Sequence, residues 1–245
     1  MYQFFVEPEQ IQGNTVTILG NDVNHIRNVL RMQTGEEISV SNGLDGKEYR
    51  CSITRMDDEN VICSLMFIKE DGIELPARVT LFQCLPKGDK MELIIQKAVE
   101  LGVYQIVPVA SKRCVVKLEE KKAAAKVRRW QGIAEAAAKQ SRRRIIPEVA
   151  SVMTFRESLV YADAMDVKLL PYELAEGMEK TKGIIGSLKE GQRIAVFIGP
   201  EGGFEEDEAA EALKAGFASI TLGRRILRTE TAGLTVMGWI MYQLE

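Results

Sequence analysis

The residues best suited to chemistry lie in the glycine-rich turn Gly199–Phe204, which reads G-P-E-G-G-F. Glycine permits positive φ and adds no side-chain bulk, so a ligand can approach the backbone of such a turn closely. Neither phosphate-binding pattern, G-x-x-x-x-G-K-[ST] or G-x-G-x-x-G, is present. The next segment opens with four acidic residues, which already complement the positive end of a helix dipole. The turn therefore favours a neutral or cationic ligand. A plain strand-to-helix connection is the alternative.

A second candidate loop spans Leu222–Gly233 and reads L-G-R-R-I-L-R-T-E-T-A-G. Three arginines follow its first glycine, and Thr229 or Thr231 is placed to cap a helix. A solvated basic turn is the alternative interpretation. The position after a predicted strand, shared with the first loop, weakens that alternative.

Alternating strand and helix patterns position these loops. They predict a largely parallel sheet with helices on both faces, in which ligands bind beyond the carboxyl ends of the strands. We expect Asp89 and Glu92 to form a capping box at the start of one helix and Gly102 to end it. The expected strands are 78–86, 104–111, 144–150, 165–173, 193–199 and 219–223, and the expected helices are 89–102, 119–141, 154–162, 205–216 and 229–244.

The first 70 residues or so have a different pattern, with short runs rich in β-branched and aromatic residues. One helical stretch, Asp22–Met32, interrupts them, and Val23, Ile26, Val29 and Leu30 fall on one of its faces. This pattern predicts a small β-barrel with one helix. The polar segment 70–77 is the best domain boundary.

Composition narrows the function. The chain has 245 residues, 46% hydrophobic and 27% charged, with a net charge of −3, which is typical of a globular protein. No apolar run is long enough to span a membrane and no signal peptide is evident, so we expect a soluble, cytoplasmic protein with four reduced, buried cysteines. The single histidine, His25, argues against a metal site and a Ser-His-Asp triad. Residues 121–146 contain nine basic residues and one acidic residue, which suits a polyanionic partner.

Several motifs, in order along the chain, together resemble the RsmE family, bacterial methyltransferases that act on N3 of a uridine in 16S ribosomal RNA. The most specific are I-G-P-E-G-G-F from Ile198 and L-G-R-R-I-L-R-T-E-T-A from Leu222, and L-L-P-Y-E from Leu169 supports them. The weaker motifs are H-I-R-N-V-L-R from His25, the segment 87–103 and Q-S-R-R-R-I-I-P from Gln140. The chain departs from the family pattern at Lys139, Arg142 and Glu205, and the last departure removes an expected helix cap.

The resemblance implies an α/β protein with a small N-terminal PUA-like β-barrel domain and a C-terminal SPOUT domain that carries a trefoil knot. We place these domains at residues 1–72 and 73–245. It also implies S-adenosylmethionine as the cofactor, the small ribosomal subunit as the partner, a homodimer, and no metal. S-adenosylmethionine carries a sulfonium cation and no phosphate, so it fits the neutral or cationic ligand that the glycine turn favours.

The resemblance and the loop positions together give candidate site residues. For catalysis we expect a charge-stabilising role for Arg228 and a base role for Glu230 or Glu201, although each carboxylate could equally serve a structural hydrogen bond. The expected cofactor contacts are Leu170, Pro171, Ile198, Gly199, Pro200, Gly202, Gly203, Leu222, Gly223, Ile226, Leu227 and Thr231. The expected RNA contacts are Arg27, Arg31, Lys87, Lys90, Arg142 and Arg143.

Three other functions compete with this interpretation. A non-catalytic RNA-binding or ribosome-assembly protein would explain the basic segment but not the gathering of loops at strand ends. A SPOUT enzyme that methylates another RNA is a closer alternative, and only the specific match to the RsmE motifs argues against it. A nucleotide-dependent enzyme ranks last, because the chain has no phosphate motif.

Overall fold

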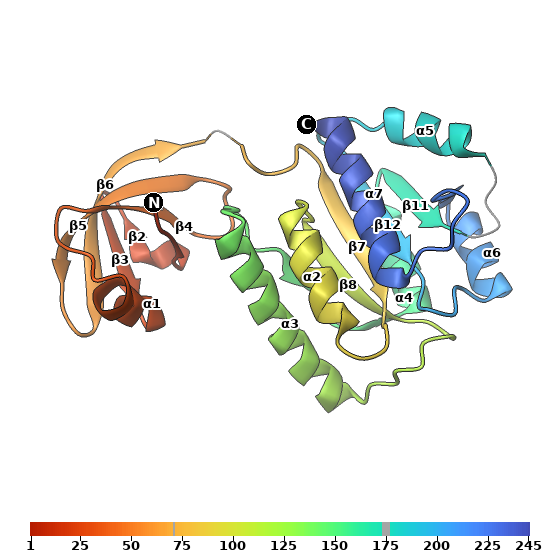
Figure 1. The fold of residues 1–245 in the computed structure, drawn as a ribbon, viewed down its shortest axis with the longest axis horizontal. Helices are drawn as coiled ribbons and strands as arrows, with labels where there is room; N and C mark the ends of the chain where they lie inside the picture. The colour runs from red at the N-terminus through yellow and green to blue at the C-terminus, as the bar shows by residue number, and fades with distance from the viewer. Residues whose placement is uncertain (71, 173–176) are drawn as a thin grey trace. The chain divides into compact units, whose positions relative to one another are not determined.

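The computed structural model describes residues 1–70, 72–172 and 177–245, which form two compact units (Figure 1). The first unit combines Met1–Glu74 with Ala138–Ile146, and the second combines Leu75–Ala137 with Pro147–Glu245. Residues 138–146, the end of α3 (Glu120–Gln140) and the segment after it, thus pack with the N-terminal part of the chain. The division of the domains at residues 72 and 73 stays a prediction.

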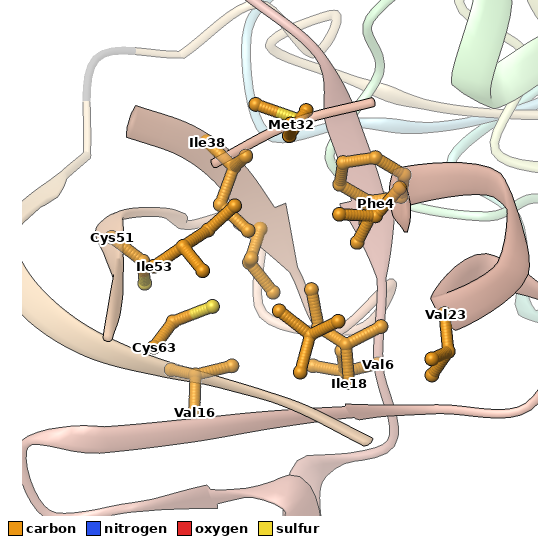
Figure 2. Close-up of a cluster of buried hydrophobic side chains, with 13 residues drawn as sticks. Phe4, Val6, Val16, Ile18, Val23, Met32, Ile38, Cys51, Ile53 and Cys63 are labelled. Carbon is orange, nitrogen blue, oxygen red and sulfur yellow. The ribbon is translucent and has the colours of Figure 1, made fainter. Parts of the chain in front are cut away.

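The first unit is built on a six-stranded sheet in the order β1-β4-β5-β6-β3-β2. β1 and β4 pair in parallel and all other neighbours pair antiparallel. Figure 2 shows side chains from several of these strands meeting in one apolar core, including Phe4 of the edge strand β1 and Val16 near the opposite edge. The sheet therefore wraps around its core, as a barrel does. Its strands are β1 (Gln3–Phe5), β2 (Ile11–Gln12), β3 (Thr15–Leu19), β4 (Glu37–Ser41), β5 (Glu48–Met56) and β6 (Asn60–Lys69), with a 3-10 turn η1 at Pro8–Gln10.

The helix of this unit differs from the prediction in its pitch. It begins as α1 (Asn21–Asn24) and continues as a π-helix, η2 (His25–Val29), in which the Leu30 N–H donates to the His25 carbonyl at 2.9 Å. Val23 and Ile26 are buried as expected, but Val29 is 60% exposed. The wider π turn rotates Val29 away from the apolar face, which a 3.6-residue period could not reveal.

Residues 138–146 are tied to the first unit by buried ion pairs and backbone hydrogen bonds. Arg143 Nε donates to Glu74 Oε2 at 2.9 Å, and Arg144 Nη2 donates to Glu48 Oε2 at 2.7 Å. The Gln3 side chain donates to the Arg143 carbonyl at 2.7 Å. This segment is an integral part of the unit rather than a surface arm.

The second unit has one parallel sheet in the order β10-β8-β7-β12-β11-β13, with β9 also paired to β8. The predicted parallel α/β architecture is therefore confirmed. Its strands are β7 (Arg78–Cys84), β8 (Gln105–Ala110), β9 (Glu148–Val149), β10 (Met153–Thr154), β11 (Val167–Pro171), β12 (Arg193–Ile198) and β13 (Ala218–Ile220). Its helices are α2 (Lys90–Glu100), α3 (Glu120–Gln140, whose end belongs to the first unit), α4 (Phe155–Tyr161), α5 (Met178–Gly186), α6 (Glu206–Lys214) and α7 (Thr229–Leu244), with η3 at Ala162–Ala164.

The alternation of side chains along the strands explains how helices cover both faces of this sheet. Phe197 of β12 points to one face, where its ring lies 5.4 Å from that of Phe155 on α4. Its neighbour Ile198 points to the other face, where Gly233 lets α7 approach closely: a Cβ there would lie 3.4 Å from Ile198. The last helix thus begins over the middle of the sheet.

Two local predictions are wrong, and one helix was missed. Asp89 stands before α2 but its carboxylate makes no capping hydrogen bond, because the Glu92 N–H donates to the Asp89 backbone carbonyl instead, at 3.0 Å. The Glu92 side chain pairs with Arg129, at 2.8 Å. The residue that caps α7 by position is Arg228, and neither Thr229 nor Thr231 takes that role. Helix α5 was not predicted, since two glycines lie within it and weaken its helical signal. The stop at Gly102 is confirmed by its φ of +86°, and all four cysteines are free and buried.

Candidate functional site

Three loops at the carboxyl ends of β11, β12 and β13 enclose a cavity of about 380 Å³. These strands are neighbours in the sheet, so the loops that follow them meet at one edge. The first turn of α7 closes the cavity below the glycine turn. The lining residues are Pro171, Tyr172, Ile198, Gly199, Pro200, Glu201, Gly203, Phe204, Thr221, Leu222, Gly223, Arg224, Arg225, Ile226, Leu227, Arg228, Thr229 and Ala232.

Most of the residues expected to contact a cofactor line this cavity. Those present are Pro171, Ile198, Gly199, Pro200, Gly203, Leu222, Gly223, Ile226 and Leu227. Three others lie outside it: Leu170 is fully buried in the sheet, Gly202 packs against Arg113, and Thr231 is exposed on α7. Glu173, the last residue of the L-L-P-Y-E motif, lies outside the described residues.

The glycine turn is held by aromatic packing and by a cation from a neighbouring loop. Phe204 packs on Phe197 of β12 with ring centroids 5.7 Å apart, and a Cβ on Gly199 would lie only 3.2 Å from the Phe204 ring. Arg113 Nη1 donates to the Gly202 carbonyl at 2.7 Å. A side chain at position 199 would therefore displace the ring that anchors the turn.

The glycine turn is also tied to α7 by a short chain of buried hydrogen bonds. The Thr229 hydroxyl donates to the Gly199 carbonyl at 2.7 Å and accepts from Gln83 Nε2 at 2.9 Å. Gln83 is the penultimate residue of β7 and is fully buried. From the sequence we predicted only a capping role for Thr229, and no local pattern pointed to Gln83, whose contact depends on a residue 146 positions away.

The two candidate bases share one lysine. Lys90 Nζ lies 2.9 Å from Glu201 Oε1 and 3.4 Å from Glu230 Oε2, and the Lys87 N–H also donates to Glu201, at 3.1 Å. Partial burial acts to raise the pKa of Glu201, but the hydrogen bonds from Lys90 and from backbone N–H groups outweigh it and the pKa is lowered. Glu201 lines the cavity whereas Glu230 does not.

Arginines supply the uncompensated charge of the cavity. Arg224, Arg225 and Arg228 all line it and are exposed. In the part of the chain that the structure describes, Arg228 forms no ion pair. Its guanidinium is thus available to a bound anion or to a base that develops negative charge.

The residues expected to bind RNA have different environments. Arg31, Lys87 and Arg142 are exposed. Arg27 donates to the Asp57 carbonyl at 2.7 Å and pairs with Asp58. Lys90 is paired with Glu201 and Glu230. Arg143, by contrast, is 4% exposed and bonded to Glu74.

Within the described residues, no group of three or more metal-ligating side chains is gathered. No helix in those residues is long and apolar enough to cross a membrane.

The sequence matches two family models, one over most of the N-terminal part and one over the C-terminal part. An RNA methyltransferase domain matches residues 73–241, and an RNA methyltransferase PUA domain matches residues 18–66. Together with the strand-end cavity, these matches define the class: a SPOUT-type RNA methyltransferase with an N-terminal PUA domain.

Full-length relatives narrow the class to one family. The chain is 38% identical to ribosomal RNA small subunit methyltransferase E of Bacillus subtilis, over all of this chain and 98% of the relative. It also resembles the crystal structure of a ribosomal RNA small subunit methyltransferase E from Neisseria gonorrhoeae bound to S-adenosyl methionine, with 34% identity, a TM-score of 0.84, and coverage of 99% and 97% of the two chains. A methyltransferase from Legionella pneumophila in complex with bound SAM is similar at 31% identity and a TM-score of 0.83, over 98% and 96% of the chains.

The chain belongs to the ribosomal RNA small subunit methyltransferase E family. The family resemblance of the motifs is therefore confirmed.

Proposed function

We propose that this protein transfers a methyl group from S-adenosylmethionine to N3 of a uridine in the 16S RNA of the small ribosomal subunit. The cavity at the ends of β11, β12 and β13 carries the proposal, because it joins the three most specific motifs in one site. Relatives of known structure with 31% and 34% identity hold this cofactor.

The cavity suits the chemistry of that cofactor. Leu222, Ile226 and Leu227 offer apolar surface to an adenine ring, while Gly199 and Gly203 expose backbone groups that can bond polar edges. Four acidic residues near the start of α6 disfavour a phosphate there, but not a sulfonium. When bound, S-adenosylmethionine supplies an electrophilic methyl group.

The residues of the chain then have to hold and activate the uracil ring. N3 of uridine carries a weakly acidic proton, and its loss leaves negative charge on O2 and O4. Arg228 is placed to stabilise that charge, which lowers the basicity needed in a proton acceptor. Glu201 lines the cavity and is the acceptor we propose, since a depressed pKa is tolerable once the uracil anion is stabilised. Glu230 holds Lys90 beside it.

RNA binding is proposed to use exposed basic residues on both units. Arg31 and Arg142 support this, because they are the described non-glycine residues with φ in the left-handed region, at 54° and 60°. Backbone strain of this kind often marks functional positions. Lys87 and Arg27 complete the proposed phosphate contacts. Arg143 is left out, because its buried pair with Glu74 would have to break.

We further propose that the protein acts as a homodimer in the cytoplasm, where its ribosomal substrate lies. Helices α2 and α7 pack together, and they expose Leu93 to 45% and Tyr242 to 87%. Exposed apolar surface of this kind suits a symmetric interface. Sedimentation equilibrium of the wild type and of Tyr242→Glu would test it: a monomeric wild type would rule the dimer out.

The decisive test is methyl transfer from labelled S-adenosylmethionine to small subunits that lack the modification. Digestion of the RNA should yield labelled 3-methyluridine. A different labelled nucleoside would keep the enzyme class and reject the substrate atom. Cofactor binding without transfer to subunits or to free ribosomal RNA would reject the substrate.

A further inference from the structure

A second cavity of about 210 Å³ lies in the same unit, on the far side of the loop that precedes α2. One wall is the segment 85–91, and the other combines Val116 and Leu118 with the residues Lys126 and Trp130 of α3. No residue of the cofactor cavity lines it. We propose that this pocket receives an unpaired nucleobase of the substrate RNA, other than the base that is methylated.

The walls of this pocket match the two faces and the edge of a nucleobase. Leu85, Pro86 and Met91 provide an apolar floor, and Trp130, which is 3% exposed, closes the pocket behind them. Lys126 Nζ lies 5.8 Å from the centroid of the Trp130 ring and can donate to a base carbonyl. An apolar lining of this kind can pack against any base, because every base has a π face.

Two polar features in the wall are free to read the edge of a base. The Asp89 carboxylate makes no capping hydrogen bond to α2, so it can accept from an N–H group of a ring. A Cβ placed on Gly88 would meet nothing within 4 Å, so the backbone there is open to close approach.

The charge around the pocket favours a nucleic acid over an apolar peptide or a neutral metabolite. Helix α3 exposes five basic side chains in the second unit, at Lys121, Lys122, Lys126, Arg128 and Arg129. The acidic residues at its start and the Arg129 pair with Glu92 offset only part of this charge. A polyanion running along α3 would bring its bases past the pocket mouth.

The loop between the two cavities links the pocket to methyl transfer. Gly88 and Asp89 line the second cavity, while Lys87 and Lys90 bond Glu201 in the wall of the first. A nucleotide seated in the pocket would press on the same loop that sets the position of Glu201. The inference rests on the proposed RNA substrate and adds a second binding site on it, for a nucleotide near the methylated uridine.

Fluorescence can test this directly, because the chain has two tryptophans, Trp130 and Trp239. In Trp239→Phe, the remaining emission reports on Trp130. Titration with single-stranded oligouridylate should change that emission, whereas an abasic oligomer of the same length and charge should not. An equal response to both strands would overturn the proposal, since it would show a backbone contact alone.

A matched pair of variants separates the pocket from general charge. Lys126→Ala and Lys121→Ala remove one positive charge each from exposed positions on α3, but only Lys126 lines the pocket. We expect Lys126→Ala to weaken oligouridylate binding about tenfold and Lys121→Ala to weaken it about two- to threefold. Equal losses of oligouridylate affinity in the two variants would overturn the proposed nucleobase pocket. Methylation of small subunits by the wild type is measured separately. If methylation occurs while the two variants lose equal affinity, only the pocket proposal fails and the proposed function stands.

Discussion

Two arginine clusters in this protein look alike in sequence and have opposite environments. Arg142–Arg144 lies after α3, and Arg224–Arg228 lies after β13. In the first cluster, Arg143 and Arg144 are each 4% exposed and are bonded to Glu74 and Glu48. The arginines of the second cluster are exposed around a cavity. A run of arginines thus predicts a polyanion site only where the fold places no buried carboxylate beside the arginines.

The difference has a physical origin. A buried guanidinium requires a partner, because the loss of hydration is costly and only a close carboxylate offsets it. Glu74 and Glu48 lie far from the arginines in sequence, so the pairing is invisible without the fold. The second cluster follows a strand end in a parallel sheet, where exposed loops meet and ligands bind.

The largest expected effect comes from removing a partner of the first cluster. Glu74→Ala removes the buried carboxylate that accepts from the Arg143 guanidinium and from the N–H groups of Arg144 and Ile145, and should lower the free energy of unfolding by about 3–5 kcal/mol. Urea unfolding followed by circular dichroism measures the loss. Glu70→Ala is the matched control, because that carboxylate is 69% exposed and pairs only at the surface with Lys47. Equal stability of the two variants would contradict a structural role for Arg143.

The second effect concerns turnover rather than stability. Arg228→Ala should lower the rate of methyl transfer by about 10²-fold, since it removes the cation proposed to stabilise the uracil anion. Cofactor affinity, measured by calorimetry, should stay nearly unchanged. Arg156→Ala is the control, because that exposed arginine pairs with Glu211 and lies outside the cavity. Unchanged turnover in Arg228→Ala would remove Arg228 from the reaction.

A third variant tests what holds the loop of the second cluster in place. Thr229→Val removes the hydroxyl that joins Gln83 to the Gly199 carbonyl, and the buried amide of Gln83 then keeps only its bond to the Cys84 carbonyl. We expect a loss of about 1–3 kcal/mol in stability together with weaker cofactor binding. Thr229→Ser should restore both. Thr235→Val on the same helix loses only a hydroxyl bond to the Thr231 carbonyl and should change neither property.

These cases show what the sequence could and could not predict. The spacing of apolar residues and the positions of glycine and proline predicted the parallel sheet and the helix ending at Gly102. The same signals singled out the glycine turn as a candidate site, because each of these features depends on neighbours in the chain. Long-range partners were missed: Gln83 beneath the site, Glu74 against Arg143, and Arg113 on the turn. Val29 was misplaced because a π-helix changes the period that the prediction assumes. The ligand itself became specific only through the family motifs.

The smallest expected effect concerns the pairing of Glu201 with Lys90 and the Lys87 N–H. Because the pKa of Glu201 is lowered in the folded protein, the carboxylate contributes stability above the unfolded carboxyl pKa, roughly 4.3. That contribution is lost as the pH falls through the lower pKa of the folded state. Glu201→Gln cannot titrate, so the melting temperature of the wild type should exceed that of the variant near neutral pH. The gap should close as the pH falls to about 4 and below. A gap that stays constant with pH would mean that the shape of the side chain, and not its charge, holds the loop between the two cavities.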